Sequence, residues 1–243
     1  MAEGERPAFY ALRPGGWRDY WTLLHPPYTI WHLSYVAIGA AIAPELNLQY
    51  LVESLAAFFL AIGLAAHALD ELRGRPLRTG IADGVLWSIA AVGLAGAAGL
   101  GVHGMFLVSP WFAAFIAVGA FLVLAYNLEL FGGAFHTDLW FALGWGAFAA
   151  LTGAFAQSGR ITIAAVLVAV ACAALSAAQR TLSTPVRRLR RSTLEVTGTL
   201  TLRDGSREQL DAEKLRSAPE AALRLLSLAM PLLAVGLLAA RAA

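Results

Sequence analysis

The sequence contains few charged side chains and a single cysteine. Charged residues make up 14% of the 243 residues, whereas a typical soluble domain has about 25%. Apolar residues make up 58%, so a water-soluble fold of this size would lack the polar surface needed to cover itself. The lone Cys172 excludes an intramolecular disulfide. The first 20 residues are polar and interrupted by Pro and Gly, so we expect no signal peptide. The composition indicates one domain embedded in a membrane.

Long runs without Asp, Glu, Lys or Arg predict the membrane spans, because a helix needs about 20 mostly apolar residues to cross the hydrocarbon core. The run between Asp83 and Glu129 has 45 uncharged residues, which is enough for two spans. GLGVHG at 99–104 and the Ser-Pro pair at 109–110 supply the break between them. The seven expected spans lie at 28–44, at 48–69, twice within 84–128, and at 139–159, 161–179 and 225–240.

The basic residues are concentrated on one side of this arrangement. Sixteen of the eighteen Lys and Arg lie in the N-terminal segment, in the connection between spans two and three, or at 180–224. The other side has only Arg160 and Arg241. Cytoplasmic connections carry an excess of Lys and Arg. We therefore expect a multi-pass protein of the cytoplasmic (inner or plasma) membrane, with its N-terminus in the cytoplasm and its C-terminus outside.

A single hydrophilic block precedes the last span. Residues 194–202 alternate apolar and polar side chains, Asp204-Gly205 is a turn signal, and residues 206–211 can form a returning strand. This pattern predicts a small cytoplasmic β-hairpin, with a disordered loop as the alternative. Ser217, followed by Pro-Glu at 219–220, indicates the start of the last helix. The chain then divides into an N-terminal cytoplasmic or interfacial segment (1–27), a membrane helical domain (28–180), a basic segment with the hairpin (181–219) and a final membrane helix (220–243).

His67, Asp70 and Glu71 form a first polar cluster at the cytoplasmic end of span two. Positions i, i+3 and i+4 share one face of a helix, and ionisable groups at membrane depth usually mark function. One imidazole and two carboxylates could therefore ligate a divalent cation. The alternative is that the two acids are helix-end charges paired with Arg73 or Arg75.

A second cluster occupies the connection between spans four and five. It contains Tyr126, Asn127, Glu129, His136 and Asp138. Thr137 or Asp138 is a good N-cap for span five, so Asp138 has a purely structural alternative.

A third cluster begins at Arg180 and continues with the four arginines of 187–191. These arginines can attract anionic head groups or diphosphates. The alternative is that they only determine the orientation of the protein in the membrane. All three clusters fall on the same side, which predicts one cytoplasm-facing cavity lined by the ends of spans two, four, five and six.

Three segments together resemble the UbiA superfamily of intramembrane prenyltransferases. They are AHALDELRGRPLRTG at 66–80, whose Arg-Pro-Leu and Gly80 match a family segment, HPPYTIWHLSYVAIGAAIAP at 25–44, and AYNLELFGG at 125–133. The resemblance covers residues 20–180. It implies a UbiA-like all-α bundle that moves an isoprenyl group from a prenyl diphosphate, held by Mg²⁺, to a lipid-soluble acceptor. The implied metal side is His67, Asp70 and Glu71, and the implied substrate and diphosphate side is Arg73, Arg75, Tyr126, Asn127, Glu129, His136, Asp138 and Arg180.

The acidic motifs of that family are only partly present. When His67 is aligned with the family's Asn, Glu71 is the one acid retained, and no acid occurs from 176 to 191. The alternative is therefore a non-catalytic protein that kept the fold to bind a lipid, quinone or pigment, or to assist membrane assembly. Whether the chain is an enzyme stays open at this point. A transporter is less favoured because inverted repeats are not evident. The expected partners are membrane lipids and an isoprenoid or other lipid-like molecule, and no nucleic acid.

Overall fold

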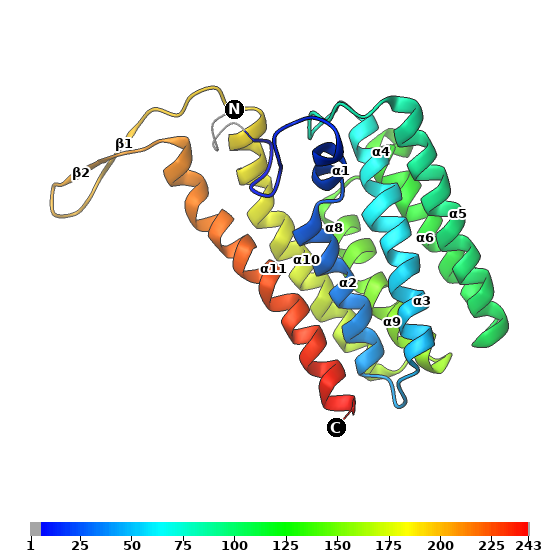
Figure 1. The fold of residues 1–243 in the computed structure, drawn as a ribbon. Helices are drawn as coiled ribbons and strands as arrows, with labels where there is room; N and C mark the ends of the chain where they lie inside the picture. The colour runs from blue at the N-terminus through cyan, green and yellow to red at the C-terminus, as the bar shows by residue number, and fades with distance from the viewer. Residues whose placement is uncertain (1–5, 243) are drawn as a thin grey trace.

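The computed structural model describes residues 6–242, which form a bundle of long helices with one small hairpin projecting from it (Figure 1). Residues 1–5 of the predicted N-terminal segment and residue 243 of the predicted last helix lie outside this part. The two ends of the described chain lie at opposite ends of the bundle (Figure 1). We refer to the end that carries residues 6–25, 72–83 and 191–212 as the basic end.

Seven helical stretches match the positions of the seven expected spans. They are α2 (Pro26–Ala41); the continuous α3 (Leu48–Phe58), η2 (Phe59–Ala66) and α4 (His67–Leu72); α5 (Asp83–Leu107); α6 (Phe112–Asn127); the continuous α8 (Asp138–Phe141), η3 (Ala142–Ala147) and α9 (Phe148–Ser158); α10 (Ile163–Arg191); and α11 (Ala212–Ala242). Two short helices, α1 (Trp17–Leu23) and α7 (Leu130–Gly133), lie in the connections. The segments η2 and η3 are wide-turn π-helices, which are often found at functional sites.

Five of the described helices are long and apolar enough to cross a membrane, which supports the prediction of a membrane protein but gives fewer spans than the seven expected. These spans are Leu48–Leu72, Asp83–Leu107, Asp138–Ser158, Ile163–Arg191 and Ala212–Arg241. The other two, α2 and α6, have 16 residues each, fewer than the about 20 that an independent span needs.

Three helix boundaries differ from the prediction. The break after α5 lies at 108–111 alone, and the glycine-rich 99–104 stays helical. Helix α10 continues beyond residue 179 to Arg191, because a charge marks where the hydrocarbon ends but does not interrupt backbone hydrogen bonding. Helix α11 begins at Ala212 rather than Ser217, because the Asp211 carboxylate accepts a hydrogen bond from the Lys214 amide at 2.7 Å and caps this end.

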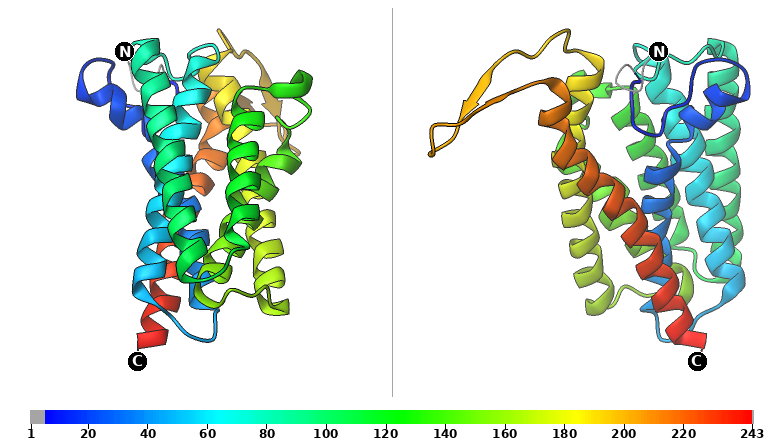
Figure 2. Two further views of the ribbon diagram at one scale, coloured as in Figure 1. Left: turned by 90° about the vertical axis from the view of Figure 1, so that its right-hand side faces the viewer. Right: turned by 60° about the vertical axis from the view of Figure 1, so that its left-hand side comes forward.

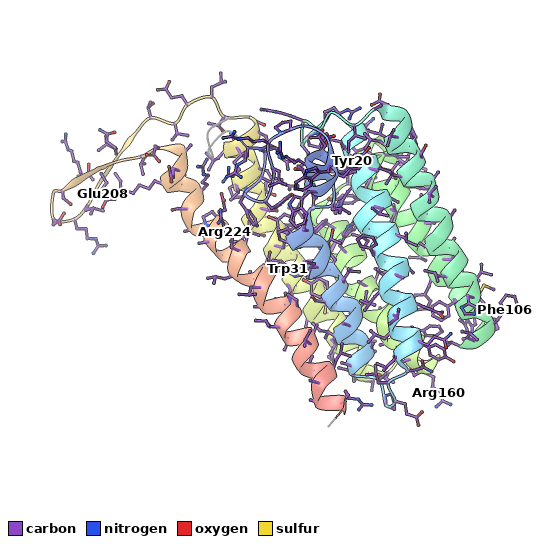
Figure 3. The ribbon with its side chains drawn as sticks, viewed as in Figure 1. Tyr20, Trp31, Phe106, Arg160, Glu208 and Arg224 are labelled. Carbon is purple, nitrogen blue, oxygen red and sulfur yellow. The ribbon has the colours of Figure 1, made fainter. Side chains whose placement is uncertain are left out.

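The predicted hairpin is confirmed, with shorter strands. Strands β1 (Thr199–Thr201) and β2 (Arg207–Gln209) pair antiparallel, with Thr199 opposite Gln209. Gly205 makes the turn with a φ of 84°, which glycine adopts without steric cost. The hairpin extends away from the helices, as Figure 1 and the right-hand view of Figure 2 show, and Glu208 lies far from the bundle (Figure 3).

Helix α2 lies at the centre of the bundle, where Trp31, Tyr35 and Val36 are fully buried. It touches α9 through backbone, since a Cβ on Gly39 would lie 2.0 Å from the Ala150 carbonyl oxygen. The contact is reciprocal, because a Cβ on Gly153 would lie 2.1 Å from the Val36 carbonyl oxygen. Small residues allow membrane helices to approach this closely. Trp31 lies about midway along the bundle, between the end that carries Tyr20 and the opposite end, which carries Arg160 (Figure 3).

Candidate functional site

A cavity of about 350 Å³ opens at the basic end of the bundle. Helices α2, α4, α6, α8 and α10 and segment η3 contribute its walls, and residues 7–10 add a further wall. This arrangement joins the ends of the second, fourth, fifth and sixth helical stretches, as the sequence predicts, and adds the first stretch and the N-terminal segment. Eight of the eleven predicted site residues line it, namely His67, Asp70, Arg73, Tyr126, Asn127, Glu129, His136 and Arg180.

Glu71 does not join this cavity. Its side chain is fully buried, and its carboxylate accepts hydrogen bonds from the Leu77 amide at 2.9 Å and from the amide and hydroxyl of Thr79 at 2.8 Å each. Glu71 therefore fixes the connection that follows it, and the predicted convergence with His67 and Asp70 does not occur. Within residues 6–242, no group of three or more His, Cys, Asp and Glu is placed to hold a metal ion.

Arg75 and Asp138 also lie outside the cavity. Arg75 donates to the Ile81 carbonyl at 2.6 Å and pairs with Asp83. Asp138 pairs with Arg180 across 2.7 Å. The N-cap of α8 is Thr137, whose hydroxyl accepts a hydrogen bond from the Trp140 amide at 3.3 Å. Asp138 thus positions Arg180 rather than capping the helix.

The mouth of the cavity carries more positive than negative charge. Arg73 is neutralised by Glu129 at 2.8 Å, and Arg180 by Asp138. Three further arginines that line the cavity, Arg187, Arg188 and Arg191, have no acidic partner among the described residues. Guanidinium groups without a carboxylate partner are well suited to bind phosphate oxygens, because the fork of N–H donors matches their geometry.

Asp70 is the other notable group at the mouth. Its carboxylate lines the cavity and has no hydrogen bond or ion pair within the described chain. The positive charges of Arg187 and Arg191 act on it through space. Of the two neighbouring acids in the sequence, Asp70 faces the cavity and Glu71 faces the protein.

The inner part of the cavity contains buried polar atoms that lack partners. His32 Nε2 lies 3.0 Å from Gln179 Oε1, and because an amide oxygen accepts, His32 Nδ1 carries a lone pair. Within the described structure, His32 Nδ1, His25 Nε2 and the Tyr126 hydroxyl are buried without a hydrogen-bond partner. Buried polar atoms are normally paired, so three such atoms around one cavity indicate space for a polar ligand group or water.

Two more histidines present acceptor nitrogens. His67 Nδ1 donates to the Gly63 carbonyl at 3.2 Å, and His136 Nδ1 donates to the Tyr126 carbonyl at 2.9 Å. Since carbonyl oxygens only accept, each Nδ1 carries the proton and each Nε2 is left as a base. The cavity can therefore accept protons or hydrogen bonds from a bound molecule.

His25 lies at the start of α2, outside the apolar part of that helix. Burial lowers the pKa of His25 well below its ordinary value of 6.5, and the nearby His67, Arg191 and Arg187 lower this pKa further. Its ring lies 4.1 Å from that of His67, measured between centroids. His25 is thus a neutral hydrogen-bonding group at physiological pH rather than a cation.

The wall formed by residues 7–10 is a part of the site that the sequence does not reveal. Arg191 Nε donates to the Pro7 carbonyl at 3.2 Å and anchors this segment to α10. Tyr10 packs against Phe9 and Tyr28, with ring centroids 5.2 and 5.5 Å apart, and burial raises the pKa of its hydroxyl. The one available signal was an aromatic pair, Phe9-Tyr10, inside an otherwise polar segment.

No protein-family model, curated protein or solved structure matches this chain. The site is therefore interpreted from its own geometry and charge.

Proposed function

We propose that the chain is a UbiA-like, multi-pass membrane protein whose basic-end cavity binds an amphiphile with a phosphate or diphosphate head. The observation that supports this most strongly is that Arg187, Arg188 and Arg191 line the cavity and have no acidic partner within residues 6–242. Arginines next to a membrane attract anionic head groups, and Asp70 is the one acid beside them that is not already in an ion pair in the described chain. The buried polar atoms below them favour a ligand that brings further polar groups into the cavity.

As a divergent prenyltransferase, the protein would use the same groups in a transfer reaction. The carbon–oxygen bond to the diphosphate breaks, the diphosphate leaves with the bonding electrons, and the acceptor forms a new bond to that carbon. The arginines would stabilise the charge on the leaving diphosphate. His67 or His136, each with a free Nε2 lone pair, would take the proton that the acceptor loses.

The residues present do not fit a three-ligand magnesium site, because Glu71 is committed to Leu77 and Thr79. Asp70 is the one predicted acid of that set that faces the cavity. No step of the proposal is therefore carried by a metal. Measuring ligand binding with Mg²⁺ and with a chelator tests this part separately.

A second candidate function is non-catalytic binding of a lipid, quinone or pigment. One observation favours it: of the two described acids that line the cavity, Glu129 is paired with Arg73, which leaves Asp70 as the one described lining acid without an ion pair. Mass spectrometry of lipids that copurify with the protein, together with an assay for isoprenyl transfer, separates the two functions. A bound lipid without any transfer would support the second.

We also propose an orientation of the protein in the membrane. The basic end would face the cytoplasm and the end that carries Arg160 would face outside, following the excess of Arg on cytoplasmic connections. Cysteine labelling in intact cells tests it. Gly205→Cys should react only after the membrane is opened, and Arg160→Cys should react from outside.

Binding measurements with matched head groups test the central claim. The purified protein in lipid nanodiscs is titrated with a prenyl diphosphate, the corresponding monophosphate and the corresponding alcohol. We expect the diphosphate to bind at least about 100-fold more tightly than the alcohol, equivalent to about 2.7 kcal/mol, and the difference to shrink at high salt. Equal affinity for all three would contradict an anionic head-group site.

A further inference from the structure

Helix α1 has two unlike faces and lies on the outside of the bundle at the basic end (Figure 2, left-hand view). Residues three and four apart share one face of a helix. One face carries the exposed aromatic side chains, which are Trp17, Tyr20 and Trp21. The opposite face carries the buried side chains, which are Asp19, Thr22 and Leu23. The aromatic face is therefore directed away from the protein.

The buried face of α1 is fastened to two segments beside the basic-end cavity. The Asp19 carboxylate accepts hydrogen bonds from the Gly15 amide at 3.0 Å and from the Gly80 amide at 3.2 Å. The Thr22 hydroxyl accepts one from the amide of Leu12 at 3.1 Å, just after the cavity wall formed by residues 7–10. These bonds fix which way α1 faces, so the exposure of its aromatic side chains is a feature of the fold.

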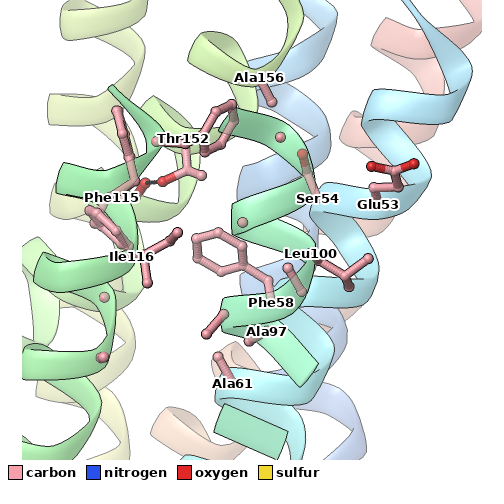
Figure 4. Close-up of a pocket in the computed structure, with 18 of the residues that line it drawn as sticks. Glu53, Ser54, Phe58, Ala61, Ala97, Leu100, Phe115, Ile116, Thr152 and Ala156 are labelled. Atoms are coloured by element: carbon pink, nitrogen blue, oxygen red, sulfur yellow. Dashed lines mark hydrogen bonds between the residues drawn. The ribbon is translucent and has the colours of Figure 1, made fainter. Parts of the chain in front are cut away.

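Helix α5 shows where the surroundings of the bundle are apolar. Its Ala97 faces the interior, where it borders an apolar pocket of about 120 Å³ together with Phe58 from α3 and Ile116 from α6 (Figure 4). The exposed large side chains of α5 include Trp87 near its start and Phe106 near its end. The inner face of α5 is thus made of small residues, and large apolar residues lie where lipid would surround the helix.

The exposed aromatic residues of α5 mark the thickness of the hydrocarbon core. At about 1.5 Å per residue, Trp87 and Phe106 lie about 28 Å apart along the helix, close to the about 30 Å of a typical bilayer core. Gly80, which binds Asp19, comes shortly before α5 begins at Asp83. Tyr20 lies toward the basic end and Phe106 toward the other (Figure 3). Helix α1 therefore lies at the level where hydrocarbon meets head groups.

The charges around the aromatic face are of one sign. Within residues 12–23 the exposed charged side chains are Arg13 and Arg18, and the single acid, Asp19, is 6% exposed. The Arg18 guanidinium lies 5.9 Å from the centre of the Trp17 ring. Trp and Tyr are enriched at membrane–water interfaces because their rings are apolar and their edges polar. Arginines at that depth attract anionic lipids.

We propose that the aromatic face of α1 lies in the lipid head-group layer at the basic end and that Arg13 and Arg18 bind anionic lipids there. This inference needs only that the long helices cross a membrane, and it holds whether or not the basic-end cavity binds a phosphate. Because α1 holds Leu12 and Gly80, its contact with lipid also sets the depth of two segments beside the cavity. The partner of this surface is the membrane itself.

Depth measurement by electron paramagnetic resonance tests the position of α1 in lipid nanodiscs. A spin label at Tyr20→Cys, in a Cys172→Ala background, leaves both tryptophans of α1 in place. The reference labels are Val92→Cys in the middle of α5 and Gly205→Cys at the hairpin turn. We expect a neutral nickel chelate, which stays in water, to reach the label at Tyr20 about threefold less than that at Gly205 and about threefold more than that at Val92.

Two results would overturn this position. Equal accessibility at Tyr20 and Gly205 would place the aromatic face in water, where a protein partner could cover it. Equal accessibility at Tyr20 and Val92 would place it in the hydrocarbon. Any position between these two references supports an interfacial helix.

Substitutions on α1 test which side chains hold it there. Trp17→Ala combined with Trp21→Ala should raise nickel accessibility at Tyr20→Cys about twofold or more. Trp111→Ala, exposed at the opposite end of the bundle, is the matched control and should change nothing. An unchanged label depth at Val92→Cys in each variant shows that the long helices keep their positions. Equal effects of the α1 and Trp111 substitutions would contradict the anchor.

The preference for anionic lipid is tested separately. Adding phosphatidylglycerol to phosphatidylcholine nanodiscs should lower nickel accessibility at Tyr20→Cys, and high salt should remove this difference. Arg13→Gln combined with Arg18→Gln should also remove it. Arg203→Gln, beside the hairpin turn, is the control and should preserve it. Identical accessibility in the two lipid mixtures would overturn binding of anionic lipid by these arginines.

Discussion

The Glu71 carboxylate is bound by Thr79, whose amide and hydroxyl both donate to the same oxygen at 2.8 Å. The other oxygen accepts from the Leu77 amide. Asp70, the preceding residue, makes no such bonds and faces the basic-end cavity. Two adjacent acids therefore have different tasks: Glu71 stabilises the connection between α4 and α5, and Asp70 contributes charge to the site.

Replacing Glu71 should destabilise the protein. Glu71→Ala leaves three donors without an acceptor inside the protein, and each unsatisfied buried group costs about 1–3 kcal/mol. We expect a loss of about 3 kcal/mol or more, measured as the free energy of unfolding in detergent. Glu71→Gln keeps one acceptor oxygen, so its free energy of unfolding should lie between those of Glu71→Ala and the wild type. A stable Glu71→Ala protein would show that these hydrogen bonds do not hold the connection.

Asp70→Asn should change binding rather than stability. Removing a negative charge beside Arg187 and Arg191 raises the positive potential of the cavity, so diphosphate should bind several-fold more tightly in the presence of a chelator. Thermal unfolding should be unchanged. If the wild type binds diphosphate more tightly with Mg²⁺ and the variant binds it more weakly and without any effect of Mg²⁺, Asp70 instead holds a metal ion.

The unpaired arginines should carry most of the head-group affinity. A charge-assisted hydrogen bond contributes about 1.5–3 kcal/mol, so Arg187→Gln should weaken diphosphate binding about tenfold or more and leave binding of the alcohol unchanged. Arg203→Gln, at an exposed position beside the hairpin turn, is the matched control. Equal effects of the two substitutions would point to nonspecific electrostatic attraction.

Stability should decrease as the pH falls below the ordinary pKa of histidine, in part because of His25. The pKa of His25 is well below 6.5 in the folded protein, so the unfolded chain binds more protons below that pH and is favoured by acid. We expect His25→Gln to reduce the loss of melting temperature between about pH 7.5 and about pH 5.5. His103→Gln, at the opposite end of the bundle, is the matched control. An unchanged pH dependence in His25→Gln would mean that other groups cause it.

The contact between α2 and α9 should tolerate no side chain at Gly39 or Gly153. A Cβ at Gly153 would meet the Val36 carbonyl at 2.1 Å, and backbone cannot move aside as a side chain can. Gly153→Ala should cost about 3 kcal/mol or more, the upper range for overpacking. Gly236→Ala has no atom within 4 Å of its new Cβ and should be neutral or mildly stabilising. Similar stability of the two variants would contradict this packing.

Helix positions were predictable because the hydrocarbon core excludes charge. The uncharged runs located each of the seven helical stretches, and period-2 alternation located the hairpin. Helix ends were less predictable, since α10 continues to Arg191 through Pro185 and α11 begins five residues before Ser217. Uncharged runs mark the apolar part of a helix, whereas the end of a helix depends on caps such as Asp211 that act through specific hydrogen bonds.

The site was predictable in composition but not in geometry. The polar residues cluster on one side in the sequence, and eight of the eleven predicted site residues line one cavity in the structure. Helical spacing alone could not separate Asp70 from Glu71, because the partners of Glu71 lie six and eight residues further along. The pairing of Asp138 with Arg180 spans 42 residues, so it depends on how α8 and α10 pack and not on any local pattern.

The contact between Arg191 and the Pro7 carbonyl joins residues 184 positions apart. The cavity is therefore complete only after the helix that ends at Arg191 has been synthesised and inserted, although one of its walls, residues 7–10, precedes that helix by more than 150 residues. Until α10 is in place, residues 7–10 lack the helix to which Arg191 anchors them. Loading with ligand is thus expected to be a late event in biogenesis, and chains truncated before α10 should insert into the membrane yet remain empty.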